Sequence, residues 1–117
     1  MKKLNVNTKE VASGIYVVEV IGFVDRHTLD TLDKALADLL EAGKSKIIVH
    51  CEELNYISSN GMGVFISHLQ AARQKGGDIR FCNMKDIGKT VITVLGLHNL
   101  FQIFDTLDEA VASYQSA

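Results

Sequence analysis

Two adjacent serines, Ser58 and Ser59, are the side chains of this sequence best placed to do chemistry, and they lie in the segment "NYISSNGMG". A serine hydroxyl there can cap a helix, attack a carbonyl carbon as a nucleophile, or accept a phosphate. The segment follows a β-prone run and precedes helical apolar spacing, so both serines are predicted at the start of a helix. Capping is the ordinary role of serine at such a place, and Gly61 and Gly63 then permit a tight turn and close packing.

Nucleotide, hydrolase and metal chemistry fit these residues less well than capping. The segment has neither the GxxxxGK(S/T) spacing of a phosphate-binding loop nor the glycines that flank the nucleophile of a serine hydrolase. Residues of a catalytic triad need not be close in sequence, so a serine hydrolase stays open as an alternative. The histidines that could act as a base or as metal ligands lack HxH or HxxxH spacing: His27, His50, His68 and His98. We therefore expect no catalytic residue, no metal site and no bound cofactor.

The composition indicates one globular domain in a reducing compartment. The chain has 117 residues, of which 47% are hydrophobic and 22% charged, so we expect a single domain over residues 1–117. A net charge of -2 offers no basic surface for nucleic acid or an anionic membrane, and the apolar runs are too short to span a bilayer. Cys51 and Cys82 lack metal-ligand spacing and are predicted to be buried, reduced thiols. We therefore expect a cytoplasmic protein.

Strands alternate with helices along the chain. Continuous or alternating apolar residues predict strands in residues 4–11, 15–24, 46–51 and 78–83. Three- and four-residue apolar spacing predicts helices in residues 25–41, 59–75, 83–95 and 106–114, with a further short strand before the last helix. This order predicts an α/β domain with a largely parallel sheet. The first two strands can pair antiparallel, which would make the sheet mixed.

Two helix starts can be predicted from their capping residues. Asn83 is expected to cap the third helix, because an asparagine side chain can accept a hydrogen bond from the first turn. The apolar stripe expected to bury that helix consists of Ile87, Val91 and Val94. "TLDE" at Thr106–Glu109 is a capping-box pattern, so the last helix is expected to begin there.

Three motifs make almost the whole chain resemble a stand-alone STAS domain of the bacterial anti-sigma factor antagonist (anti-anti-sigma factor) type. "GFVD" at Gly22–Asp25 is similar to the family's Gly-x-(Leu/Val)-Asp motif after the second strand. "IIVHCEELNYISSNGMGVF" resembles its buried strand, serine loop, paired glycines and helix. "GLHNLFQIFDTLDEAV" is similar to its closing segment, and the three motifs occur in the family's order.

The resemblance implies a small mixed, mostly parallel sheet with helices packed mainly on one side, and a binding protein without catalytic activity. It implies that the unphosphorylated protein binds an anti-sigma factor, which is itself a serine kinase, and thereby releases a sigma factor. The kinase holds the ATP and phosphorylates the antagonist, which ends the binding, and a PP2C-type phosphatase reverses the modification. Direct nucleic-acid binding and membrane insertion are not expected.

The family's spacing singles out one serine as the phosphate acceptor. That acceptor lies two residues before the first motif glycine, which is Ser59 here, with Ser58 as the secondary candidate. The surface implied to face the partner consists of Asp25, Ser58, Ser59, Asn60, Gly61 and Met62. Because a helix start tolerates negative charge, we expect a phosphate there to leave the fold almost unchanged.

Three interpretations stay open. Asp25 either precedes and favours the first helix or helps to form the partner surface. Met62 either exposes a flexible apolar side chain to the partner or packs in the core. Ser58 and His50 stand where many members of the family have aspartate, and Asn60 where many have serine, threonine or alanine. This departure leaves an alternative function, a constitutive STAS module in a larger complex such as a sensory scaffold or a lipid-transport ATPase.

Overall fold

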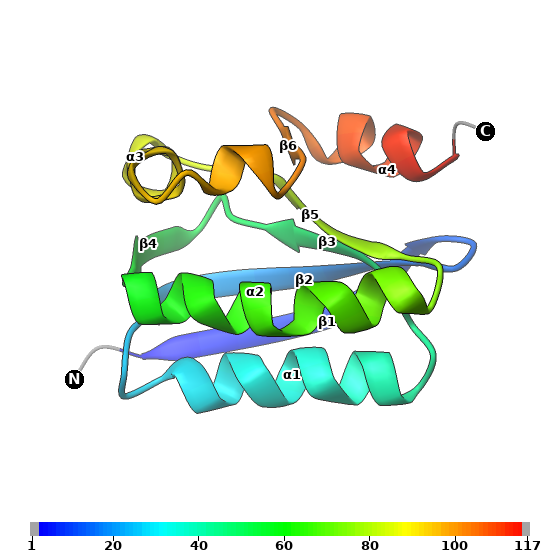
Figure 1. Ribbon diagram of the computed structural model, residues 1–117, viewed down its shortest axis with the longest axis horizontal. Coiled ribbons are helices and arrows are strands. Elements are labelled where there is room, and N and C mark those ends of the chain that lie inside the picture. Colours follow the sequence, from blue (N-terminus) through cyan, green and yellow to red (C-terminus); the bar gives the residue numbers. More distant parts are fainter. Residues whose placement is uncertain (1–2, 116–117) are drawn as a thin grey trace.

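The computed structural model describes residues 3–115, in which strands and helices alternate along the chain (Figure 1). The strands are β1 (Leu4–Ala12), β2 (Ile15–Val24), β3 (Lys46–His50), β4 (Leu54–Ile57), β5 (Asp78–Cys82) and β6 (Ile103–Phe104). The helices are α1 (Leu29–Glu41), α2 (Ser59–Gln74), α3 (Asp86–Val94) and α4 (Leu107–Gln115), with a 3-10 turn η1 (Leu97–Asn99). The predicted domain, residues 1–117, extends past the described range at residues 1–2 and 116–117.

The sheet is mixed and mostly parallel, which confirms the predicted fold class. Its order is β1-β2-β3-β5-β6, in which β1 runs antiparallel to β2 and the other pairs are parallel. Strand β4 was not predicted from the sequence; it pairs with the end of β2 beyond the point where β3 stops. This strand has four residues, of which only the first and last are buried, so it carries too little pattern to be predicted.

Gly22 lies where β2 changes its neighbour from β3 to β4. Its backbone has φ 111, and a Cβ at this position would overlap the carbonyl oxygen of Lys3. The Gly22 N–H donates to the carbonyl of Glu53, at 2.9 Å, on the chain leading into β4. Because of this φ and the close approach of Lys3, only glycine fits at this junction.

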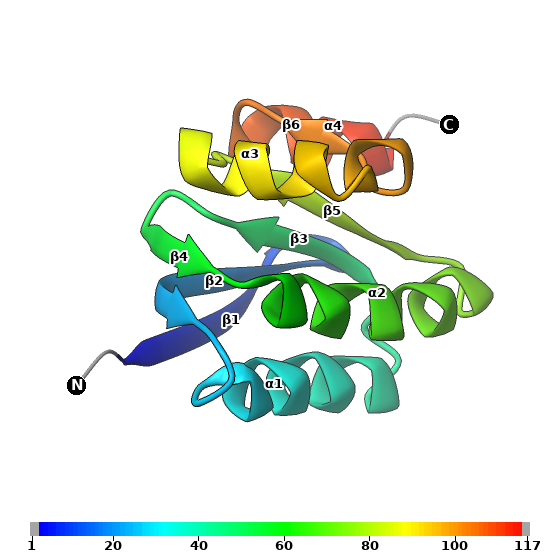
Figure 2. The ribbon, with the colours of Figure 1, turned by 60° about the vertical axis from the view of Figure 1, so that its left-hand side comes forward.

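The two faces of the sheet bury two separate apolar clusters. Helices α1 and α2 pack side by side on one face (Figures 1 and 2) and bury the main core, which includes Leu32, Leu36, Phe65, Leu69, Ile79 and Phe81. Helix α4 covers the other face and buries the second core, which consists of Ile15, Val17, Ile48, Cys82 and Ala110. Alternation along β2 separates the clusters, because Val18 and Val20 face the first and Val17 the second.

The third helix differs from its prediction. It begins at Asp86 after Lys85 as N-cap residue, while Asn83 lies outside the helix with φ 55, so Asn83 does not cap it. Ile87 and Val94 are 44% and 78% exposed, and the buried residues of α3 are Gly88 and Ile92. Apolar residues occur on more than one side of this helix, so spacing alone did not identify the buried side.

The predicted capping box at the last helix is confirmed. The backbone N–H of Glu109 donates to the hydroxyl oxygen of Thr106, at 3.1 Å. In return, the backbone N–H of Thr106 donates to the Glu109 carboxylate, at 3.2 Å. This exchange satisfies two donors that would otherwise lack partners at the start of α4.

Candidate functional site

Ser58 closes the amino end of α2, as the capping hypothesis predicts. Its backbone is extended, with φ -82 and ψ 166, and its Oγ accepts a hydrogen bond from the Gly61 N–H at 3.1 Å. Its own N–H donates to the carbonyl of Val24, at 2.9 Å, which joins the end of β2 to the start of α2. The Ser58 hydroxyl is half-buried and is already engaged in holding the helix start.

Ser59 differs from its neighbour in every one of these respects. It is the first residue of α2, it is exposed, and its hydroxyl makes no hydrogen bond within the described part of the chain. The first turn of α2 holds no acidic residue, so the positive end of the helix dipole is not neutralised by a side chain. An exposed hydroxyl beside an uncompensated helix start is accessible to a reagent and tolerant of added negative charge.

Gly61 and Met62 turn inward and do not belong to the exposed surface. A Cβ on Gly61 would lie 2.6 Å from a Val24 methyl and 3.0 Å from Ile57, so α2 starts in direct contact with β2 and β4. Met62 is 1% exposed and belongs to the main core. Of the two interpretations of Met62, packing in the core is confirmed and exposure to a partner is wrong, because the first turn of α2 points this side chain at the sheet.

Asp25 lies on the same edge of the sheet as the serines. Val24 pairs with Ile57 in the parallel register of β2 and β4, so the residues that follow each strand are neighbours. The Asp25 carboxylate accepts a hydrogen bond from the His27 N–H at 2.8 Å, and its N–H donates to the Thr28 hydroxyl at 3.0 Å. Asp25 thus shapes the turn before α1 without being its N-cap residue.

A shallow groove runs along the serines, between them and α3. Its volume is about 360 Å³. Its lining residues are Tyr56, Ile57, Ser58, Ser59, Thr90, Val91, Val94 and Leu95. None of the lining residues is acidic or basic, and Tyr56, Val94 and Leu95 are exposed. We call this surface the α3 groove. It was not predicted from the sequence, because the apolar spacing of α3 placed Val94 in the core, whereas Val94 is exposed.

The other side chains considered for catalysis are not gathered at the serines. His68 contacts Asp33 on α1, with 2.7 Å between Nε2 and Oδ1, and His27 lies against Arg26. His50 ends β3, and His98 is exposed in η1. Within residues 3–115, no three histidine, cysteine or acidic side chains are grouped so that they could hold a metal ion.

The two cysteines are buried and unpaired, as predicted. Cys51 lies in the main core and Cys82 in the second core, so the thiols belong to opposite faces of the sheet. Burial, with a smaller contribution from Glu52, raises the pKa of Cys82 to about 12. Burial raises the pKa of Cys51 still further above its ordinary range. Because both thiols are buried, neither is a candidate nucleophile in the folded protein.

The chain belongs to the STAS domain family, since the family model described as "STAS domain" matches residues 7–110. Among its relatives is the anti-sigma-B factor antagonist of Staphylococcus aureus, which is 27% identical over 100 residues that cover 86% of this chain and 92% of the relative. None of the helices described here is long and apolar enough to cross a membrane.

Solved structures of similar proteins share the fold. An anti-sigma factor antagonist from Mycobacterium paratuberculosis superimposes with a TM-score of 0.86 at 17% identity, over 97% of this chain and 96% of that one. Unphosphorylated SpoIIAA, an anti-sigma factor antagonist, has a TM-score of 0.81 at 19% identity, over 95% and 96% of the two chains. SpoIIAA has also been solved in its phosphorylated form, with a TM-score of 0.73 at 19% identity, over 94% and 99%.

Proposed function

We propose that this protein is an anti-sigma factor antagonist that binds its anti-sigma factor while Ser59 is unphosphorylated, and so releases a sigma factor. Relatives named as antagonists match along most of both chains, which favours this function over a constitutive scaffold. The observation that carries the proposal is the exposed, unbonded hydroxyl of Ser59 at the rim of the uncharged α3 groove.

The α3 groove is the surface that a kinase acting on Ser59 has to cover. Phosphoryl transfer requires the partner to bring its ATP within bonding distance of the Ser59 oxygen, and Val94 and Leu95 line the same groove. A few well-packed side chains near the centre of an interface contribute most of its binding energy, and tyrosine, which this groove has in Tyr56, is common among them. Asp25 and Asn60, beside the serines, complete the proposed contact surface.

A phosphate on Ser59 acts on the interface and leaves the fold intact. It adds a charge of about -1.5 to -2 at the positive end of α2, where that charge is favourable. In the complex, the same charge would be removed from water next to apolar groups without a partner, at a cost of several kcal/mol. Binding is therefore lost while the free protein keeps its structure.

The remaining parts of the switch lie on other proteins. The anti-sigma factor is the serine kinase and holds the ATP, so this chain needs no cofactor and performs no catalysis. A PP2C-type phosphatase removes the phosphate from Ser59 and restores binding. All of these steps take place in the cytoplasm.

The test uses the full chain and the purified kinase-type anti-sigma factor encoded in the same genome. Affinities are measured by calorimetry for the wild type, Ser59→Ala and Ser59→Asp, with Ser58→Ala as the neighbouring control. We expect the wild type and Ser59→Ala to bind with equal affinity, and Ser59→Asp to lose at least about a hundredfold in affinity. With ATP present, mass spectrometry should locate the phosphate on residue 59. A phosphate elsewhere, together with full binding by Ser59→Asp, would contradict the proposal.

A further inference from the structure

Helix α4 buries few of its apolar side chains completely. Of its own residues only Ala110 is fully buried, while Leu107, Val111 and Tyr114 are half-buried. The second core beneath it has five buried residues, of which Ala110 alone comes from α4 and the other four come from strands. Hydrophobic stabilisation scales with the apolar area buried. Burial of apolar side chains therefore contributes less to holding α4 on the sheet than it does for α1 and α2.

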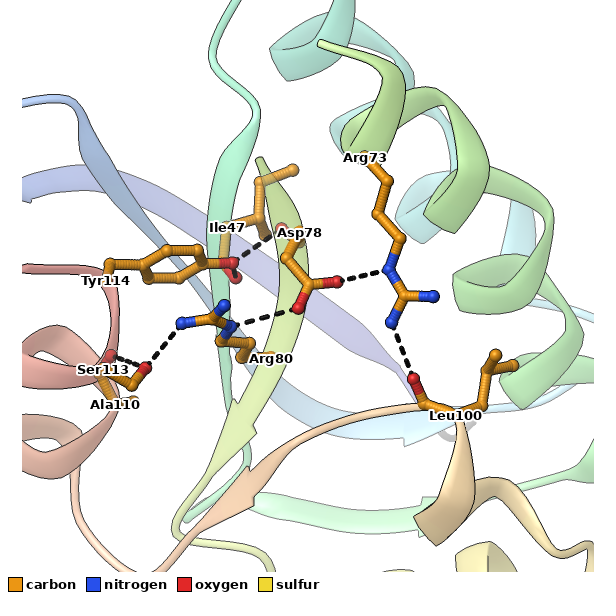
Figure 3. A network of polar contacts seen from close by, with 8 residues as sticks. All are labelled: Ile47, Arg73, Asp78, Arg80, Leu100, Ala110, Ser113 and Tyr114. Atoms are coloured by element: carbon orange, nitrogen blue, oxygen red, sulfur yellow. Dashed lines mark hydrogen bonds and ion pairs between the residues drawn. The ribbon is translucent and has the colours of Figure 1, made fainter. Parts of the chain in front are cut away.

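Polar contacts fasten the end of α4 to the strands (Figure 3). The Tyr114 hydroxyl lies 2.8 Å from the carbonyl oxygen of Ile47 and 2.7 Å from that of Asp78, so its one hydrogen is shared between two strands. The Arg80 guanidinium lies over the Tyr114 ring, at 4.0 Å from its centre, and donates to the Ser113 hydroxyl at 2.8 Å. We call these contacts of Tyr114 and Ser113 the α4 latch.

Asp78 and Arg80, which contact α4, also have partners outside α4. The Asp78 carboxylate is buried and binds Arg80 through one oxygen and Arg73 of α2 through the other, each at 3.0 Å. Arg73 also donates to the carbonyl of Leu100, at 2.8 Å. Figure 3 shows that α4 contributes no charge to this arrangement. If α4 leaves, the buried carboxylate keeps both arginines, so opening creates no unpaired buried charge.

We propose that α4 is a latched lid, which opens as a unit while α1, α2 and the sheet stay folded. Opening uncovers an apolar strip, made of Ile15, Val17, Ile48 and Cys82, on the face of the sheet opposite the main core. The protein thus has a second apolar surface, separate from the α3 groove, which is exposed only when α4 opens. This inference concerns α4 alone and does not depend on the proposed function.

The two cysteines make lid opening measurable in the wild-type protein. Cys82 is 0% exposed beneath α4, and Cys51 is 1% exposed in the main core, so neither reacts in the closed fold. N-ethylmaleimide alkylates an uncovered thiolate: sulfur bonds to one alkene carbon, and the other takes a proton from water. Trypsin then separates the two sites, on peptides 47–73 and 81–85. Each alkylation rate reports how often its own layer opens.

The expected result is a large difference between the two thiols. Cys82 should be alkylated faster than Cys51 by on the order of a hundredfold, because only Cys82 is uncovered by local opening. Low concentrations of urea should accelerate Cys51 steeply and Cys82 little, since opening the main core exposes far more surface. Tyr114→Phe should accelerate Cys82 about tenfold and leave Cys51 unchanged, because it removes the shared hydrogen bond without changing shape. Tyr16→Phe, on β2, is the matched control and should change neither rate.

Two results would overturn the lid. Equal alkylation rates that rise in parallel with urea would mean that Cys82 is reached only by global unfolding. If Cys82 is alkylated in Tyr114→Phe at the wild-type rate, the hydrogen bonds of Tyr114 do not hold α4 closed. If Tyr114→Phe does not fold, the urea dependence of the wild type still decides between local and global opening.

Discussion

The two faces of the sheet are covered by layers that bury different numbers of apolar side chains. On one face, α1 and α2 bury large side chains such as Leu36 and Phe65. On the other face, α4 buries only Ala110 completely, packs Leu107 and Val111 against the strands half-buried, and bonds to two strands through the Tyr114 hydroxyl. Ser59 stands at the start of α2 and therefore in the layer that buries the larger core. The proposed phosphorylation site is thus built on the part of the fold with the most buried apolar surface.

Truncating a side chain in each layer should give the largest difference. Leu36→Ala is expected to lower the free energy of unfolding by about 3 kcal/mol, because Leu36 is fully buried in the main core. Val111→Ala, on the half-buried side of α4, should lower it by about 1 kcal/mol. Urea denaturation of both variants measures this, and equal losses would mean that the two layers do not differ in strength.

The start of α2 should be nearly as sensitive as the main core. Gly61→Ala places a methyl group 2.6 Å from Val24, which should cost about 2 kcal/mol and weaken partner binding as α2 shifts. The matched control is Gly63→Ala, whose Cβ meets nothing within 4 Å and which should gain up to about 1 kcal/mol of helix stability. Thermal unfolding of both variants tests this, and a neutral Gly61→Ala would show that the close contact is not required.

Two leucines should separate partner binding from stability. Leu95→Ala, in the α3 groove, is expected to weaken binding to the anti-sigma factor about tenfold and to change stability by less than about 0.5 kcal/mol. Leu107→Ala, on α4, should lower stability by about 1 kcal/mol and leave binding unchanged. Calorimetric titration and urea denaturation measure the two effects. Loss of binding in Leu107→Ala alone would place the partner on the α4 face.

The smallest effect should distinguish the two serines. Ser58→Ala removes the hydroxyl that accepts from Gly61 and should cost about 1 kcal/mol. Ser59→Ala removes an exposed hydroxyl without a hydrogen bond and should change stability by less than about 0.5 kcal/mol. Urea denaturation is precise enough to separate them. Equal costs would mean that Ser59 also holds the helix start.

Local patterns in the sequence predicted the parts of the fold that depend on neighbours along the chain. The capping box of Thr106 and Glu109 and the leucine stripe of α1 are of this kind. Two features were not predicted: β4 and the buried side of α3. Each depends on which segment packs against it, and a four-residue strand or a helix with apolar residues on several sides leaves that choice to the tertiary structure. The α3 groove was missed for the same reason.

The Ser58 cap also has a consequence for how fast the proposed switch would act. The cap is made by Ser58 and Gly61 and does not use the Ser59 hydroxyl, so in the proposed switch neither state would have to refold on the way to the other. The fraction of protein in each state would then follow the ratio of kinase to phosphatase activity. A cell would move that set point in either direction by changing one enzyme, while this chain would stay the same folded molecule.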